Sequence, residues 1–237
     1  MKWFNDLKVS VKLIGGFLMV ALLLIVVAYV GYANMKSIDD SLTAMYFDNA
    51  VPIGDLGYAA KELYRIRGDV YKFILIPEDR EASERAVNEA IAAVNQRIEK
   101  YRAVNLTQEE KDELAAFDAA WAAYQKAVAD VLAAVKAGDE EAALASIANG
   151  GVVANARTAV YSSMEELIAL NLRTAEELDR QGDVTFASSV RTMVAVAVVA
   201  VLVAVALGLF ISNSITTPLE IMTGGLQAMA RGELNRD

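Results

Sequence analysis

The stretch TQEEKDELAAFDAAWAAYQKAVADVLAAV (Thr107–Val135) decides the fold. Its large apolar side chains recur at alternating spacings of three and four residues, the pattern of a helix that packs in a bundle. Thr107 followed by Glu110 is typical of a capping box at a helix start, and Gly138 marks the end of this helix. The predicted core positions are Leu114, Phe117, Trp121, Tyr124, Val128, Val131 and Val135.

Three more helical patterns accompany this one, and no strand-like alternation appears in the sequence. A short helix is expected over Asp139–Ala148, before the fourth. Short connections make successive helices antiparallel, so residues 36–191 are predicted to form an all-α, up-down-up-down four-helix bundle. The predicted core positions are Ile53, Leu56, Ala60, Leu63, Arg67, Val70 and Ile74 in the first helix, Val87, Ile91, Val94, Ile98 and Tyr101 in the second, and Val153, Val160, Met164, Leu167, Asn171 and Leu178 in the fourth.

The composition narrows the classes of function. The 237 residues include no Cys and no His, which excludes disulfides, Cys/His zinc sites and histidine catalysis. Residues 36–191 carry 17 basic and 27 acidic side chains, a balance that disfavours nucleic-acid binding. The acidic runs lack calcium-loop spacing, and no phosphate loop or nucleophile elbow is present. We expect no enzyme activity, no cofactor and no metal.

Two uncharged stretches are long enough to cross a membrane, which takes about 20 apolar residues. The first, residues 13–35, lies between Lys12 and Lys36, and the second, residues 192–213, follows Arg191. The sequence therefore predicts a sensor domain flanked by two transmembrane helices. A cleaved signal peptide is the alternative for the first stretch, with Gly31-Tyr32-Ala33 as its cleavage site.

Basic residues near the first span predict the orientation. Lys2, Lys8 and Lys12 precede it, and such residues stay in the cytoplasm. Residues 1–12 are therefore expected to be cytoplasmic. The bundle would lie outside the cell membrane, periplasmic or extracellular, and the C-terminus inside.

A cluster of cations and tyrosines is the candidate ligand site. Arg67 interrupts the apolar pattern of the first helix, and a buried guanidinium needs a partner. Because arginine binds carboxylates in a two-pronged geometry, we expect a small carboxylate ligand, an organic acid or amino acid. A structural ion pair or a side chain at a subunit interface is the alternative. The predicted ligand-binding residues are Tyr64, Arg65, Arg67, Tyr71, Lys72, Asn155, Arg157 and Thr158.

Three segments carry a resemblance to a known family. LYRIRGDVYKFI (Leu63–Ile74) and the long stretch beginning at Thr107 resemble the sensory bundle of methyl-accepting chemotaxis proteins. SITTPLEIMTGGLQAMARGEL (Ser214–Leu234) resembles the first helix of a HAMP relay domain, with Pro218 and Glu220 as its Pro-x-Glu motif. The resemblance covers nearly the whole chain.

This resemblance implies a homodimeric chemoreceptor that relays a small helix displacement to a cytoplasmic kinase and adaptor. Residues 214–237 would form the first HAMP helix with Pro218 as a joint, and the rest of HAMP and the output domain would follow Asp237. In related receptors, first-helix arginines bind ligand carboxylates, and Arg65 and Arg67 fall in the matching motif. The alternatives are the sensor of a histidine kinase or nucleotide cyclase, or a non-sensory membrane-anchored dimerisation module.

Overall fold

The computed structural model describes residues 8–230, so the predicted cytoplasmic segment 1–12 and HAMP helix 214–237 lie partly outside the described residues. Within that range every regular element is a helix, which confirms the predicted all-α class. The chain divides into two units, residues 39–182 and the residues on either side of them. The elements are α2 (Val9–Ala44), the π-helix η1 (Met45–Ala50), α3 (Val51–Leu75), the 3₁₀-helix η2 (Pro77–Asp79), α4 (Arg80–Arg102), α5 (Gln108–Lys136), α6 (Glu140–Ile147) and α7 (Val152–Ala230).

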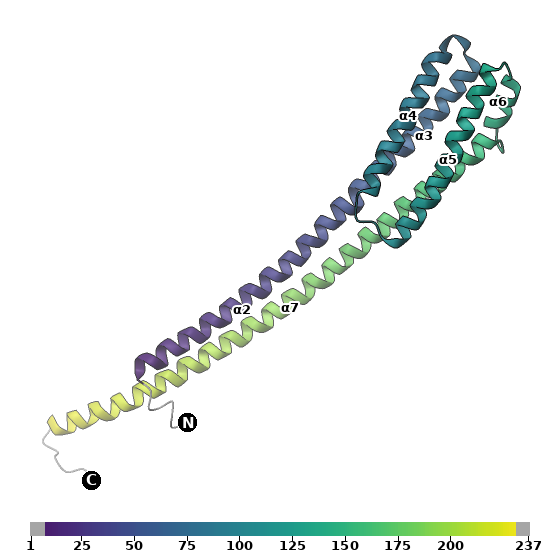
Figure 1. Ribbon diagram of the computed structural model, residues 1–237. Helices are drawn as coiled ribbons and strands as arrows, with labels where there is room; N and C mark the ends of the chain where they lie inside the picture. Colours follow the sequence, from purple (N-terminus) through teal and green to yellow (C-terminus); the bar gives the residue numbers. More distant parts are fainter. Residues whose placement is uncertain (1–7, 231–237) are drawn as a thin grey trace. The chain divides into compact units, whose positions relative to one another are not determined.

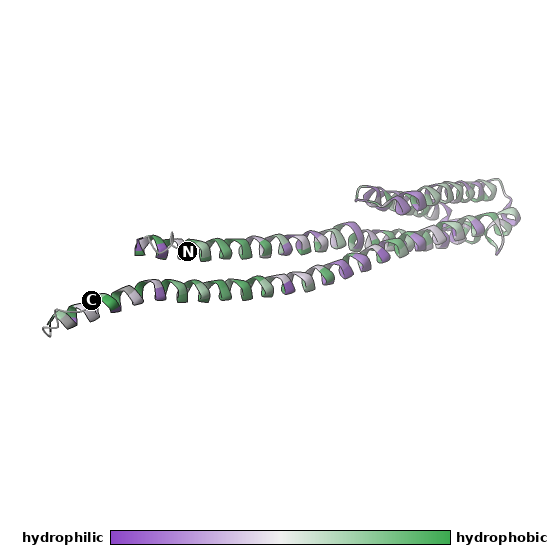
Figure 2. Cartoon of the chain, turned by 90° about the horizontal axis from the view of Figure 1, so that it is seen from below, coloured by the Kyte–Doolittle hydropathy of each residue, from purple (hydrophilic) through white to green (hydrophobic). Residues whose placement is uncertain are grey.

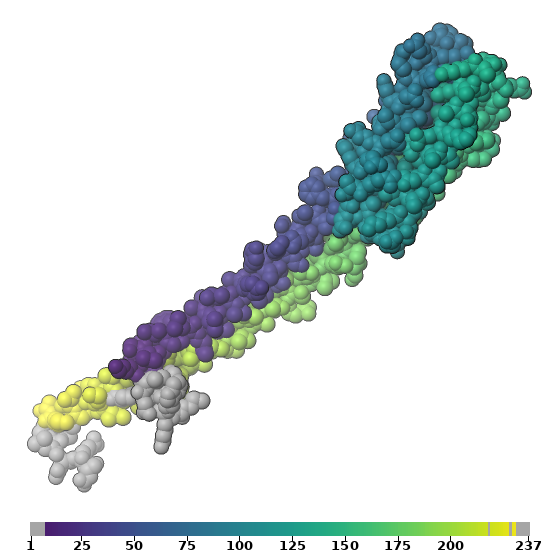
Figure 3. Space-filling view, in the orientation of Figure 1, coloured from purple at the N-terminus to yellow at the C-terminus, as the bar shows by residue number. Residues whose placement is uncertain are grey.

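Residues 39–182 form a four-helix bundle, as the sequence predicted. Helix α3 turns back through η2 into α4, and α5 returns through α6 into α7 (Figure 1). Apolar side chains of α3, α4, α5, α6 and α7 make one continuous core cluster, and they leave no open channel on the face seen in Figure 3. Burial of this shared apolar surface stabilises helices that would be marginal alone.

Helix α5 confirms the sequence analysis closely. All seven predicted core side chains, from Leu114 to Val135, are buried. The Thr107 hydroxyl accepts from the Glu110 N–H at 3.2 Å, and the Glu110 carboxylate accepts from the Thr107 N–H at 2.7 Å. The helix ends at Lys136, and Gly138 two residues later has a φ of 86°, in the left-handed region that glycine adopts without strain.

The predicted core face of α3 is partly wrong. Leu56, Leu63, Val70 and Ile74 are buried as expected, but Ala59, Ile66 and Phe73 also belong to the buried face. Arg67 is exposed, and Ala60 is only partly buried. The two candidate faces share every seventh residue, so periodicity alone does not separate them. The observed face buries Ile66 and Phe73 and keeps the guanidinium in water, which avoids the cost of desolvating it.

A π-helical segment between α2 and α3 was not predicted. It spans Met45–Ala50, and Pro52 follows it at the start of α3. Proline has no N–H and its ring clashes with the carbonyl four residues earlier, here that of Asp48. The wider π turn accommodates both effects. The buried Asn49 side chain donates to the Ala44 carbonyl at 3.3 Å.

The other unit contains most of α2 and the C-terminal part of α7. Both helices are long and apolar enough to cross a membrane, by length and composition, and Figure 2, which colours the chain by residue hydropathy, shows these segments mostly in the green of hydrophobic residues. They pack closely at glycines: a Cβ on Gly16 would lie 3.0 Å from Ile211 Cδ1, and one on Gly31 would lie 3.6 Å from Met193 Cε. The exact limits of the two spans stay predictions.

Candidate functional site

Arg65 and Lys72, two of the predicted ligand-binding residues, already have acidic partners. The Arg65 guanidinium lies 3.2 Å from the Glu89 carboxylate on α4 and 3.4 Å from that of Glu62. The Lys72 ammonium lies 3.4 Å from the Asp69 carboxylate, which also approaches Arg65 at 3.8 Å. Both cations therefore serve ion pairs at the surface of α3.

Arg67 and Arg157 differ from them in that neither forms an ion pair with an acid among residues 8–230. Arg67 is exposed on α3, and its guanidinium carbon lies 5.7 Å from the centre of the Tyr71 ring, a cation–π distance. Arg157, on the first turns of α7, is half-buried. Two uncompensated guanidinium groups on neighbouring helices favour the binding of an anion.

Tyr124 of α5 lies close enough to both arginines for their charges to affect its hydroxyl. Its side chain is 1% exposed, yet its hydroxyl makes no hydrogen bond with any described residue. Burial raises the pKa of Tyr124 to about 12, and the positive charges of Arg157 and then Arg67 oppose this rise. The hydroxyl is therefore within electrostatic reach of both guanidinium groups. A buried hydroxyl without a partner is costly, and a bound acceptor would remove that cost.

Tyr161 lies at the border of the same cluster. Its hydroxyl donates to the Ala60 carbonyl of α3 at 3.3 Å, and its ring lies 5.1 Å from that of Tyr64. Burial, more than its neighbours, raises the pKa of Tyr161. These contacts join α7 directly to α3. A ligand held by both helices would act on this connection.

Asn155 and Thr158 make local bonds instead of facing the cluster. The Asn155 amide donates to the Gly150 carbonyl at 3.0 Å, and the Thr158 hydroxyl donates to the Ala154 carbonyl at 2.9 Å. Of the predicted residues, the cluster therefore contains Arg67, Tyr71 and Arg157, with Tyr64 at its edge.

The sequence analysis missed one functional candidate, Tyr124, because it read that residue as core packing. The prediction of burial is confirmed, but a tyrosine at a core position also brings a hydroxyl that needs a partner. No apolar residue would raise that question. The signal in the sequence was therefore a tyrosine at a core position where phenylalanine would pack equally well.

A second polar cluster lies where α4 turns into α5. The Asn171 amide of α7 donates to the Tyr101 hydroxyl at 2.8 Å, and that hydroxyl donates to Glu110 Oε1 at 3.4 Å. Asn171 and Glu110 are 0% and 2% exposed. The capping box of α5 is thus tied to α7. The buried Asn171 side chain therefore has a structural partner, which joins α7 to the ends of α4 and α5.

The predicted relay residues lie on α7. The helix continues through Pro218 to Ala230, and Glu220 is exposed on it. Proline removes one backbone hydrogen bond even when the helix continues. Their role in relay stays a prediction. Among residues 8–230, no group of three or more acidic side chains is placed to hold a metal ion.

Comparison with known proteins places the bundle in a family. No curated protein and no solved structure matches the chain significantly. One family model does match, over residues 6–186, and it describes a four-helix-bundle sensory module for signal transduction. The match covers most of the chain, including all of α3, α4, α5 and α6. The chain therefore belongs to the family of four-helix-bundle sensory modules for signal transduction.

Proposed function

We propose that this protein is a transmembrane chemoreceptor that binds a small carboxylate outside the membrane and relays helix motion inward to control chemotaxis. The observation that carries the proposal is the buried Tyr124 hydroxyl, which has no hydrogen-bond partner among residues 8–230 and lies within electrostatic reach of Arg67 and Arg157. Neither arginine forms an ion pair with an acid in that range. One carboxylate would neutralise the guanidinium groups and accept from the hydroxyl. The family match supports the sensory role.

The relay in this proposal runs through α7, one helix from Val152 to Ala230. A carboxylate held by Arg67 on α3 and Arg157 on α7 would shift α7 along α3. Helix displacements of about 1–2 Å are the usual scale of such switches. The ligand drives the shift only by its difference in affinity for the two positions. The Tyr161–Ala60 hydrogen bond is the first contact that such a shift would change.

The remaining parts of the proposal follow from the family resemblance and from charge. The receptor is a homodimer in the cell membrane. Both of its termini are cytoplasmic, because Lys8 and Lys12 precede the first span. Residues 214–237 begin a HAMP relay that acts on a cytoplasmic kinase and adaptor. Ligand recognition needs no cofactor, and the bundle catalyses no reaction.

Binding to the full chain in lipid nanodiscs tests the proposal. A panel of small mono- and dicarboxylic acids and amino acids is screened by thermal shift, and hits are measured by calorimetry. Arg67→Ala should weaken a hit by roughly 10–100-fold, because hydrogen bonds to charged groups contribute about 1.5–3 kcal/mol.

Arg65→Ala is the matched control. It removes the same group two residues away, where Glu62 and Glu89 already engage it, and should change affinity less than about threefold. Equal losses in the two variants would indicate general charge attraction instead of a site at Arg67. The absence of any hit from the panel would count against a carboxylate sensor.

A further inference from the structure

Aromatic rings gather around the two arginines of the ligand cluster. Four of the nine tyrosines of the chain lie there, namely Tyr64 and Tyr71 of α3, Tyr124 of α5 and Tyr161 of α7. Along α3, Tyr64, Arg67 and Tyr71 follow one another at spacings of three and four residues, which puts them on one face of the helix. The Arg67 guanidinium is therefore flanked by two rings of its own helix.

The same face of α3 is joined to α7. The Tyr64 and Tyr161 rings lie 5.1 Å apart, and the Tyr161 hydroxyl donates to the Ala60 carbonyl at 3.3 Å. Arg157 precedes Tyr161 by four residues, so both lie on one face of α7. The two guanidinium groups and the tyrosines consequently belong to the surfaces through which α3 and α7 meet.

Part of this aromatic surface is open to water. Tyr64 is 63% exposed although its ring contacts Tyr161, whereas Tyr71 and Tyr161 pack partly against the core. Aromatic rings prefer offset-stacked or edge-to-face partners at centroid distances of about 4.5–7 Å. A ligand that brings a ring of its own next to Arg67 would cover the exposed face of Tyr64, and an aliphatic acid would gain less from that contact.

The cluster offers no acid to a positively charged group of a ligand. Burial raises the pKa values of the Tyr124 and Tyr161 hydroxyls. Among residues 8–230, the only charged side chains that act on these two hydroxyls are those of Arg157 and Arg67. An α-ammonium group would therefore lie beside two guanidinium groups without a carboxylate to pair with. Since like charges placed together oppose binding, the cluster disfavours amino acids.

We propose that the ligand of this cluster is an aromatic carboxylate that carries no ammonium group. The carboxylate lies between the guanidinium groups of Arg67 and Arg157 and accepts from the Tyr124 hydroxyl. The ring of the ligand packs on the exposed face of Tyr64. This inference rests on the proposed carboxylate sensor and narrows its ligand from small acids in general to the benzoate class.

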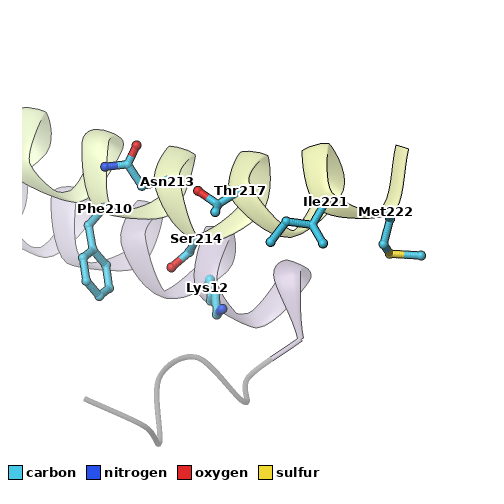
Figure 4. Close-up of a pocket in the computed structure, with 7 residues that line it drawn as sticks. All are labelled: Lys12, Phe210, Asn213, Ser214, Thr217, Ile221 and Met222. Carbon is cyan, nitrogen blue, oxygen red and sulfur yellow. The ribbon is translucent and has the colours of Figure 1, made fainter. Parts of the chain in front are cut away.

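A second place with a cation lies in the membrane-spanning unit and provides a control. Figure 4 shows Lys12, Phe210 and Ser214 at a pocket of about 760 Å³ between α2 and α7. Lys12 and Phe210 already have interactions within the chain, so the pocket gives no indication of a ligand. A carboxylate drawn to Lys12 by charge alone would nevertheless imitate binding at the bundle, and the test therefore includes Lys12→Gln.

Calorimetry on the full chain in lipid nanodiscs compares two matched pairs of acids at neutral pH. Benzoate and cyclohexanecarboxylate have the same charge and similar size, but only benzoate is aromatic, so benzoate should bind about two- to tenfold more tightly. Phenylalanine differs from hydrocinnamate only in its ammonium group, and it should bind at least about tenfold more weakly. Equal affinities within either pair would overturn the inference.

Variants then locate the aromatic contact. Tyr64→Leu should bring the dissociation constants of benzoate and cyclohexanecarboxylate to within about twofold of each other, because the ring that favours benzoate is gone. Tyr58→Leu is the matched control, since Tyr58 is a 56% exposed tyrosine of α3 whose ring lies instead 4.6 Å from the guanidinium carbon of Arg97. Tyr58→Leu and Lys12→Gln should leave both affinities within about twofold of wild type. Loss of the preference in Tyr58→Leu, or loss of binding in Lys12→Gln, would place the contact elsewhere and overturn the inference.

The outcomes separate this inference from the function on which it rests. If cyclohexanecarboxylate binds as tightly as benzoate and Arg67→Ala weakens both equally, the carboxylate sensor stands and the aromatic ligand is wrong. If no carboxylate binds the wild type, both are wrong.

Discussion

Replacing Tyr124 with phenylalanine should have opposite effects on stability and on ligand binding. Phenylalanine fills the same space and removes only the hydroxyl, which is buried and makes no hydrogen bond with any described residue. A buried polar group without a partner costs about 1–3 kcal/mol. The ligand-free Tyr124→Phe variant should therefore be about 1 kcal/mol more stable than the wild type. For a domain of this size, that raises the unfolding midpoint by roughly 2–4 °C.

The same change should weaken carboxylate binding. A hydrogen bond to a charged acceptor contributes about 1.5–3 kcal/mol, so the dissociation constant should rise roughly 10–100-fold. The two quantities are measured on the same preparation, by thermal unfolding without ligand and by calorimetry with the best ligand from the panel. A gain in stability with a loss in affinity is the expected pattern for a residue kept for binding.

Tyr101→Phe is the control, because its hydroxyl is bonded to Asn171 and Glu110. Removing it leaves buried partners unpaired and should destabilise the protein by about 1–3 kcal/mol without changing ligand affinity. If Tyr124→Phe destabilised the protein as much as Tyr101→Phe does, its hydroxyl would be satisfied in the free protein and the reasoning would be refuted.

Three further predictions concern the bundle. Ile66→Ala should lower the free energy of unfolding by about 2–5 kcal/mol in chemical denaturation because Ile66 is fully buried, whereas Arg67→Ala should lower it by less than about 1 kcal/mol. The reverse order would support the core face of α3 that the sequence predicted. Thr107→Ala should cost about 1 kcal/mol in the same assay by removing the N-cap of α5, and an unchanged midpoint would contradict that role. Burial raises the pKa values of Tyr101, Tyr124 and Tyr161, so above a pH of about 10 the folded state holds protons that the unfolded chain has lost. The free energy of unfolding should therefore be constant below a pH of about 10 and fall as the pH rises toward 12. Unfolding midpoints that stay constant over that range would argue against burial of these hydroxyls.

The parts of the fold that were predictable depend on patterns within one helix. The α5 core positions and the Thr107 capping box follow from spacing alone, and both are confirmed. The buried face of α3 does not follow from spacing alone, because Leu56, Leu63 and Val70 are common to two possible faces. Whether Arg67 or Ile66 is buried depends on the neighbouring helices. The π-helix also had a local signal, Pro52, that the sequence analysis did not use.

The candidate site was less predictable because it depends on pairs of helices. Glu89 on α4 pairs with Arg65, whereas no acid among residues 8–230 pairs with Arg67, and periodicity within one helix specifies neither. That the Tyr124 hydroxyl has no hydrogen-bond partner within residues 8–230 likewise depends on which side chains of α3 and α7 lie opposite α5. The residue types indicated an anion site, but which residues belong to it depends on how the helices pack.

A double-mutant cycle on ligand binding tests the central claim most directly. Arg67→Lys, Arg157→Lys and the double variant are titrated by calorimetry with the same carboxylate, lysine being chosen so that binding stays measurable. If one ligand is held by both guanidinium groups, the losses should be non-additive by at least about 1 kcal/mol, or roughly fivefold in the dissociation constant. Strictly additive losses, or no loss in either single variant, would contradict a shared carboxylate site between α3 and α7.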